Sequence, residues 1–123
     1  MQRILLKAKI HRARITEARL DYEGSLTIDA TLMALADIAP YEQVKVYNLS
    51  NGERFDTYAI EGKAGSGEIC LNGAAARKGE PGDLVIITTY ALFEAEEAAC
   101  HEPRLVFLDE ANRPVDRTVA TAV

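Results

Sequence analysis

The bond between Gly24 and Ser25 is the position where the residue types of this chain allow chemistry on the backbone itself. A serine hydroxyl can attack the preceding carbonyl and turn the amide into an ester, if the backbone is strained and the developing oxyanion is held. Glycine before the serine leaves that carbonyl open because it has no Cβ. Elimination from the ester gives dehydroalanine, which hydrolyses to a pyruvoyl group. The dipeptide by itself favours a tight turn, as we interpret the second pair, Gly65-Ser66.

A second candidate group is cationic and lies near the N-terminus. Lys7, Lys9 and His11 alternate with Ala8 and Ile10, which is typical of a strand with one polar and one apolar face. Residues 1–20 hold six Lys or Arg and one Glu, although the whole chain has a net charge of −5. The polar face is either solvated surface, which the segment alone favours, or a cationic wall for an anionic small molecule.

Composition predicts one domain spanning residues 1–123, since the chain has 123 residues and is 48% hydrophobic. No apolar run has the length of a membrane span and the N-terminus lacks a signal-peptide pattern, so we expect a cytoplasmic protein without a membrane partner. The net negative charge argues against a general nucleic-acid binder. Cys70 and Cys100 lack metal-ligand spacing, which predicts free thiols and no metal site.

Most segments of the chain have strand character. Alternation or runs of β-branched residues predict strands at 15–22, 25–28, 69–71, 84–93 and 104–109. Asn51-Gly52 predicts a hairpin with a type I′ turn between strands at 44–48 and 53–59. In the second of these strands, Thr57 and Tyr58 face opposite sides of a simple sheet unless twist or a bulge redirects them.

Helices are expected to be few and short. Asp29 is expected to cap a helix over 30–37, which Pro40 closes. The acidic, alanine-rich segment 94–102 predicts an exposed helical turn or loop. The tail from about residue 114 is expected to be flexible. Regular short strands with few helices favour a closed barrel.

Two loops could approach a ligand. The glycine-rich segment 62–68 lacks the lysine and the following helix of a phosphate loop, so a flexible connection fits it better. The small residues at 72–76 predict either a turn whose backbone N–H groups come close to a ligand or a turn into a short helix.

Together these motifs resemble the pyruvoyl-dependent aspartate 1-decarboxylases, bacterial enzymes that make β-alanine for pantothenate and coenzyme A biosynthesis. The resemblance extends to about Arg113 and rests on Lys-Ile-His-Arg at 9–12, Tyr-Glu-Gly-Ser at 22–25, and the segments 51–60, 72–75 and 82–87. It implies a mainly β fold, a double-psi β-barrel with short helices. It also implies a homotetramer with sites between subunits.

The resemblance further implies that a zymogen cuts itself between Gly24 and Ser25. The products would be a β chain, residues 1–24, and an α chain, residues 25–123, that begins with a pyruvoyl group derived from Ser25. Thr57 would support the oxyanion during cleavage. Whether cleavage needs a helper protein stays open.

In the implied mechanism, the amine of L-aspartate forms a Schiff base with the pyruvoyl ketone at position 25, CO2 departs, and Tyr58 donates a proton. Arg54 and Lys9 are hypothesised to hold the retained side-chain carboxylate, since a cation on the departing carboxylate would stabilise the ground state more than the transition state. The resemblance places further residues in the substrate site or in support of it: Thr57, Asn72, Gly73, Ala74 and Ala75, with His11 and Tyr22 supporting.

Two other classes remain open on the sequence. A non-catalytic double-psi barrel used as a binding module would keep the Gly24–Ser25 bond intact. A serine hydrolase could use Ser25 with His11 and an Asp, but the chain has no G-x-S-x-G elbow.

Overall fold

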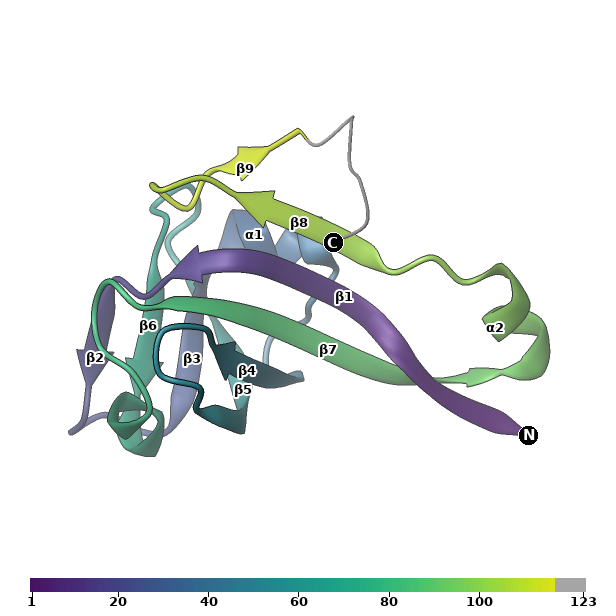
Figure 1. Cartoon of the computed structure of the whole chain (residues 1–123), viewed down its shortest axis with the longest axis horizontal. Helices are drawn as coiled ribbons and strands as arrows, with labels where there is room; N and C mark the ends of the chain where they lie inside the picture. Colours follow the sequence, from purple (N-terminus) through teal and green to yellow (C-terminus); the bar gives the residue numbers. More distant parts are fainter. Residues whose placement is uncertain (117–123) are drawn as a thin grey trace.

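The computed structural model describes residues 1–116, which form one mixed sheet of nine strands with two short α-helices and a 3₁₀ helix (Figure 1). The strands are β1 (Gln2–Arg14), β2 (Glu17–Arg19), β3 (Ser25–Asp29), β4 (Gln43–Asn48), β5 (Arg54–Gly62), β6 (Ile69–Asn72), β7 (Leu84–Glu94), β8 (Arg104–Leu108) and β9 (Pro114–Val115). The helices are α1 (Ala30–Ala36), η1 (Gly73–Arg77) and α2 (Ala95–Cys100). The expectation of a mainly β fold with short helices is confirmed.

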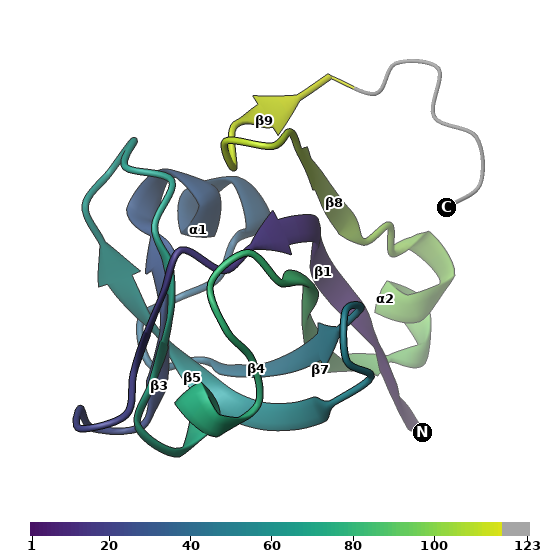
Figure 2. The ribbon, with the colours of Figure 1, turned by 60° about the vertical axis from the view of Figure 1, so that its left-hand side comes forward.

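The sheet curls round its core into a barrel-like shape. Its strand order is β2-β6-β3-β5-β4-β7-β1-β8-β9. β1 continues into β2 through two residues only, Ile15 and Thr16, although β2 lies at the far edge of that order. Backbone bonds from Ile15 N to Asp83 O (2.9 Å) and from Thr16 N to Ile69 O (2.8 Å) join the two sides there. The strands therefore surround the core (Figure 2).

The alternation predicted at the start of the chain is present in β1. Ala8 and Ile10 are fully buried in the core, whereas Lys7, Lys9 and His11 on the other face are partly exposed. Lys7 forms an ion pair with Glu42, with 2.8 Å between Nζ and Oε2. Its charge is therefore already balanced within the fold.

Helix α1 begins where the sequence predicts and is one residue shorter. The Asp29 carboxylate accepts a hydrogen bond from Thr31 N (2.8 Å), as an N-cap does. It also accepts bonds from Gly65 N (3.0 Å) and Gly67 N (2.8 Å) in the connection between β5 and β6. One buried carboxylate thus fixes both the start of the helix and a connection for which the sequence predicts only flexibility.

The β4–β5 hairpin is present, but its predicted type I′ turn is wrong. Asn48 N donates to Glu53 O (2.8 Å), which leaves a four-residue loop, 49–52, in which Gly52 has a φ of 79°. Asn51 is not among the non-glycine residues with positive φ in the described part of the chain. The Asn48 side chain explains the longer loop, because its Oδ1 accepts bonds from Ser50 N (2.8 Å) and Asn51 N (3.2 Å).

Three other segments differ from their predictions. The strand expected at 15–22 is limited to β2, and residues 20–23 form the turn that leads to Gly24. β7 is buried only in its first half; beyond Thr89, Tyr90 and Leu92 are exposed. Pro114 and Val115, at the start of the tail, pair with β8 as β9, and the tail beyond residue 116 lies outside the described residues. None of the helices in residues 1–116 has the length and apolarity needed to cross a membrane.

Candidate functional site

Ser25 is held by a polar network although it lies at the very start of its strand. It is the first residue of β3, its side chain is 1% exposed, and it pairs directly with Asn72 of β6. Asn72 Nδ2 donates to Ser25 Oγ (2.9 Å) and to Thr27 Oγ1 (2.8 Å). The hydroxyl that the sequence marks as a nucleophile is therefore buried and fixed in direction.

Gly73 lies against the backbone of the Gly24–Ser25 segment. It has a φ of 63°, and a Cβ at this position would stand 2.7 Å from Gly24 Cα and from Tyr22 O. A Cβ at Gly24 itself would meet nothing within 4 Å, so one side of the Gly24 backbone is open. Of the two structures predicted for segment 72–76, the turn into a short helix is confirmed, because the segment forms the 3₁₀ helix η1. Within η1, Ala75 is buried and Ala74 is exposed.

Tyr58 and Thr57 come beside Ser25 through the parallel pairing of β3 with β5. The ladder begins with the pair Leu26 and Ala59, so Ser25 and Tyr58 are the residues that come directly before this pair on the two strands. Thr57 comes before Tyr58, at the Gly24 end of the bond. β5 keeps unbroken register with β4 from Arg54 to Tyr58, so no bulge redirects these side chains and they leave opposite faces.

Arg54 lies on the same strand but four residues from Tyr58, which is about 13 Å along a strand. Its guanidinium carbon stacks 4.0 Å over the ring of Tyr47, its partner across the hairpin. It lines a cleft of about 450 Å³ together with Ile4, Lys45, Tyr47, Phe55, Asp56 and Tyr90. Lys45 is paired with Asp56 at 3.0 Å, whereas no ion pair within residues 1–116 neutralises Arg54. Arg54 therefore keeps a positive charge that an anionic ligand can use.

The cleft also contains a pair of tyrosines that the sequence analysis missed. The hydroxyls of Tyr47 and Tyr90 lie 3.1 Å apart. Burial would raise the pKa of Tyr47, but hydrogen bonds with Thr88 and Tyr90 and the charge of Arg54 lower it below its ordinary value. The sequence does not predict this contact, because the predicted two-residue turn at Asn51-Gly52 would place Leu49 rather than Tyr47 opposite Arg54.

Lys9 and His11 lie on β1, which β5, β4 and β7 separate from β3 in the strand order. Lys9 pairs with Thr88 on one side and Leu105 on the other. His11 pairs with Phe107, whose ring it meets edge-on at a centroid distance of 5.6 Å. Within the described residues, no hydrogen bond or ion pair connects Lys9 or Arg54 to the network round Ser25. In a single chain, the two predicted cations therefore do not belong to the hydrogen-bond network of the predicted reacting residue.

Tyr22 lies in the turn before Gly24 and is half exposed. It lines a hollow of about 440 Å³ with Ala18, Arg19, Leu20 and Asp21.

The residues round Ser25 fit a pyruvoyl group derived from that serine. The position is buried, a fixed amide N–H of Asn72 points at its side chain, and Gly73 allows the backbone to pass closely. The same geometry does not favour a serine hydrolase, since the partner of Ser25 Oγ is an amide donor and three strands lie between β3 and the strand of His11 in the strand order.

The chain is similar to known proteins over nearly its whole length. The family model for aspartate decarboxylase matches residues 1–115. The aspartate 1-decarboxylase of Syntrophobacter fumaroxidans is 67% identical over 117 residues, which cover 95% of this chain and 94% of the relative. The aspartate 1-decarboxylase of Thermoanaerobacter pseudethanolicus is 58% identical over 116 residues, covering 94% and 99%. That of Dehalococcoides mccartyi strain 195 is 60% identical over 109 residues, covering 89% and 88%. The chain belongs to the aspartate decarboxylase family.

Proposed function

We propose that this chain is a carboxy-lyase that cuts itself at Gly24–Ser25 and then converts L-aspartate to β-alanine and CO2, in the cytoplasm and for pantothenate biosynthesis. The observation that carries the proposal is the buried Ser25 hydroxyl, which Asn72 holds beside an open glycine. Membership of the aspartate decarboxylase family supports the same chemistry.

Self-cleavage would begin when Ser25 Oγ attacks the Gly24 carbonyl carbon. The C–N bond breaks, the Ser25 nitrogen takes up a proton, and an ester joins Gly24 to Oγ. Loss of the Ser25 α-proton then breaks the Cβ–Oγ bond, so Oγ leaves as part of the Gly24 carboxylate; water converts the dehydroalanine to the pyruvoyl group with release of ammonia. The Asn72 N–H would stabilise the charge that grows on Oγ. Thr57 is proposed to support the first oxyanion.

The pyruvoyl group, once formed, supplies the electron sink that decarboxylation of an amino acid needs. Arg54 is proposed to bind the side-chain carboxylate of aspartate, since its charge has no ion pair within residues 1–116 and its guanidinium carbon lies over the ring of Tyr47. Lys9 adds a second cation. Tyr58, beside position 25, is proposed to donate the proton that replaces CO2, and the backbone from Asn72 to Ala75 to orient the substrate.

A homotetramer with sites between chains would bring these groups together. Within residues 1–116 of one chain, no hydrogen bond or ion pair connects Arg54 or Lys9 to Ser25, whereas a neighbouring copy could present its cationic cleft to the open side of Gly24. The exposed apolar residues on β1 and β7 offer a surface for that contact.

Intact mass under denaturing and reducing conditions tests the proposal. We expect two fragments, residues 1–24 and 25–123, with the larger lighter by one ammonia than a chain that begins with serine. Ser25→Ala should remain one full-length chain. The purified wild type should also release β-alanine from L-aspartate. A wild-type chain that stays intact on incubation and heating, with or without cell extract as a source of a helper, would overturn the proposal and favour a binding module.

A further inference from the structure

We propose that Cys70 is a positioning residue for the Gly24–Ser25 bond, acting through Asn72. This inference rests on the proposed self-cleavage and adds a residue to it. It concerns a side chain that the sequence predicts to be only a free thiol.

Cys70 is built into the network round Ser25. It lies on β6, two residues before Asn72, so both side chains leave the same face of the strand. Its side chain is 1% exposed, and its Sγ lies 3.2 Å from Asn72 Oδ1. The carbonyl oxygen of Leu71 is more distant from Sγ, at 3.9 Å. A chain of hydrogen bonds therefore runs from the thiol of Cys70 through the amide of Asn72 to the hydroxyl of Ser25.

The thiol decides which way the amide points. The oxygen and nitrogen of an asparagine amide have nearly the same shape, so a flip exchanges them at little steric cost. The hydroxyls of Ser25 and Thr27 can accept or donate and so do not select either orientation. A thiol does favour one orientation, because its sulfur is only a weak acceptor and its proton is directed at Oδ1, which places Nδ2 against Ser25 Oγ.

The orientation matters because Oγ gains negative charge when it leaves with Gly24. An N–H group in contact with Oγ stabilises that charge, whereas an amide oxygen there would oppose it. Without a donor at position 70, a buried Oδ1 would be unpaired in the observed orientation, and the flipped amide would become competitive. The expected consequence is slower cleavage.

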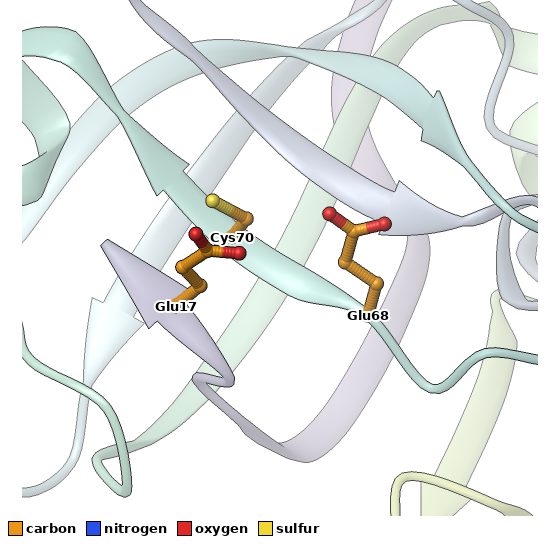
Figure 3. Close-up of side chains that lie close together, drawn as sticks. All are labelled: Glu17, Glu68 and Cys70. Atoms are coloured by element: carbon orange, nitrogen blue, oxygen red, sulfur yellow. The ribbon is translucent and has the colours of Figure 1, made fainter. Parts of the chain in front are cut away.

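The surroundings of Cys70 keep its proton in place. Glu17 and Glu68 stand beside it, and the carboxylate oxygens and Sγ of the three residues all lie within 4.8 Å of one another (Figure 3). Burial and the charge of Glu17 raise the pKa of the thiol, an effect that Arg19 opposes only in part. Arg19 is itself bound to Glu17, with 2.6 Å between Nε and Oε2. The thiol is thus a stable donor at neutral pH and a poor thiolate ligand for a metal.

The test follows cleavage during cell-free synthesis of four chains: wild type, Cys70→Ala, Cys70→Ser and Cys100→Ala. Intact mass gives the rate at which fragments 1–24 and 25–123 appear. We expect Cys70→Ala to cleave about tenfold more slowly. Cys70→Ser keeps a donor, but its hydroxyl can also accept from the amide, so it should cleave faster than Cys70→Ala and more slowly than wild type. Cys100→Ala, which changes the exposed cysteine, should match wild type. Should Cys70→Ala not fold, as judged by thermal unfolding, Cys70→Val replaces it.

A second comparison separates positioning from packing. In an Asn72→Ala background, the Cys70→Ala and Cys70→Ser variants should cleave at the same rate, because the amide that relays the effect is absent. Equal rates for Cys70→Ala and Cys70→Ser in the native background would overturn the inference while leaving the proposed function intact. A wild-type chain that never cleaves would overturn the proposed function, and the inference with it.

Discussion

Ser25 meets an amide donor, and this distinguishes it from a hydrolytic serine. A base would take the proton of the hydroxyl, whereas Asn72 Nδ2 gives a hydrogen bond to Oγ and stabilises the oxygen as charge builds on it. The proposed self-cleavage needs fixed donors and an unhindered carbonyl, and Asn72 and Gly24 have these properties. Arg54 differs from Ser25 in that it offers a positive charge. Its guanidinium lies over the ring of Tyr47 and has no ionic partner in residues 1–116.

Arg54→Gln should raise the KM for L-aspartate about tenfold or more and change kcat less. The reason is that the guanidinium is proposed to bind a carboxylate that the substrate keeps throughout the reaction, so the loss affects ground state and transition state alike. Steady-state kinetics on fully processed enzyme measures this. Arg3→Gln, on the exposed start of β1, is the control for charge. An unchanged KM in Arg54→Gln would disprove the assignment.

At the scale of elements, the Asp29 carboxylate joins three segments: the end of β3, the first turn of α1 and the connection from β5 to β6. Burial alone would raise the pKa of Asp29, but the backbone N–H groups of Gly67, Gly65 and Thr31 outweigh it and lower the pKa below 3.8. Because β3 begins with Ser25, this carboxylate also anchors the strand that carries the reacting residue.

Asp29→Asn should lower the free energy of unfolding by about 2 kcal/mol at pH 7, since charge-assisted bonds are replaced by weaker ones. A lowered folded pKa stabilises the protein fully above the unfolded value of 3.8, and this contribution is lost as the pH falls through the folded pKa. The difference between wild type and variant should therefore be constant from pH 7 to about 4 and narrow at lower pH. Urea titrations across this range measure it.

The matched control for Asp29 is Asp37→Asn, the same change at the opposite end of α1. Asp37 is the C-cap with a φ of 57°, which asparagine adopts readily, so this variant should stay within about 0.5 kcal/mol of wild type. A pH-independent deficit in Asp29→Asn would mean that lost packing, rather than the carboxylate charge, causes the effect.

For the whole molecule, the notable surface is the ribbon of β1 and β7, which extends beyond the rest of the fold toward the N-terminus and α2 (Figure 1). Ile4 and Leu92 pair across it and are 70% and 60% exposed. Apolar side chains exposed in such a group are typical of a surface that another protein covers. In the proposed homotetramer, a second copy of the chain would cover this surface.

Leu92→Lys should therefore convert the proposed tetramer to smaller species and reduce decarboxylation, because a charge is placed in an apolar contact. Light scattering coupled to size-exclusion chromatography measures the mass. Leu49→Lys, at an exposed apolar residue in the β4–β5 loop, is the control and should leave the mass unchanged. A wild-type monomer with full activity would contradict the shared site.

The sequence by itself determined the features that depend on neighbours along the chain. The polar and apolar faces of β1, the Asp29 cap, the hairpin and the small-residue segment after Asn72 follow from local periodicity and capping. The Gly24-Ser25 pair and the other family motifs indicated the chemistry, and the family comparison agrees with them.

Only the tertiary structure decided which groups meet, since pairing between distant strands is not encoded locally. The side chain of Asn48 lengthens the hairpin loop, and this change sets the register that puts Tyr47 on Arg54. The pairing of β3 with β6 and β5 brings Asn72 to Ser25 and Tyr58 beside it. The structure also shows that Cys70 belongs to the same hydrogen-bond network. Cys70 lies two residues before Asn72, so both side chains are on the same face of β6.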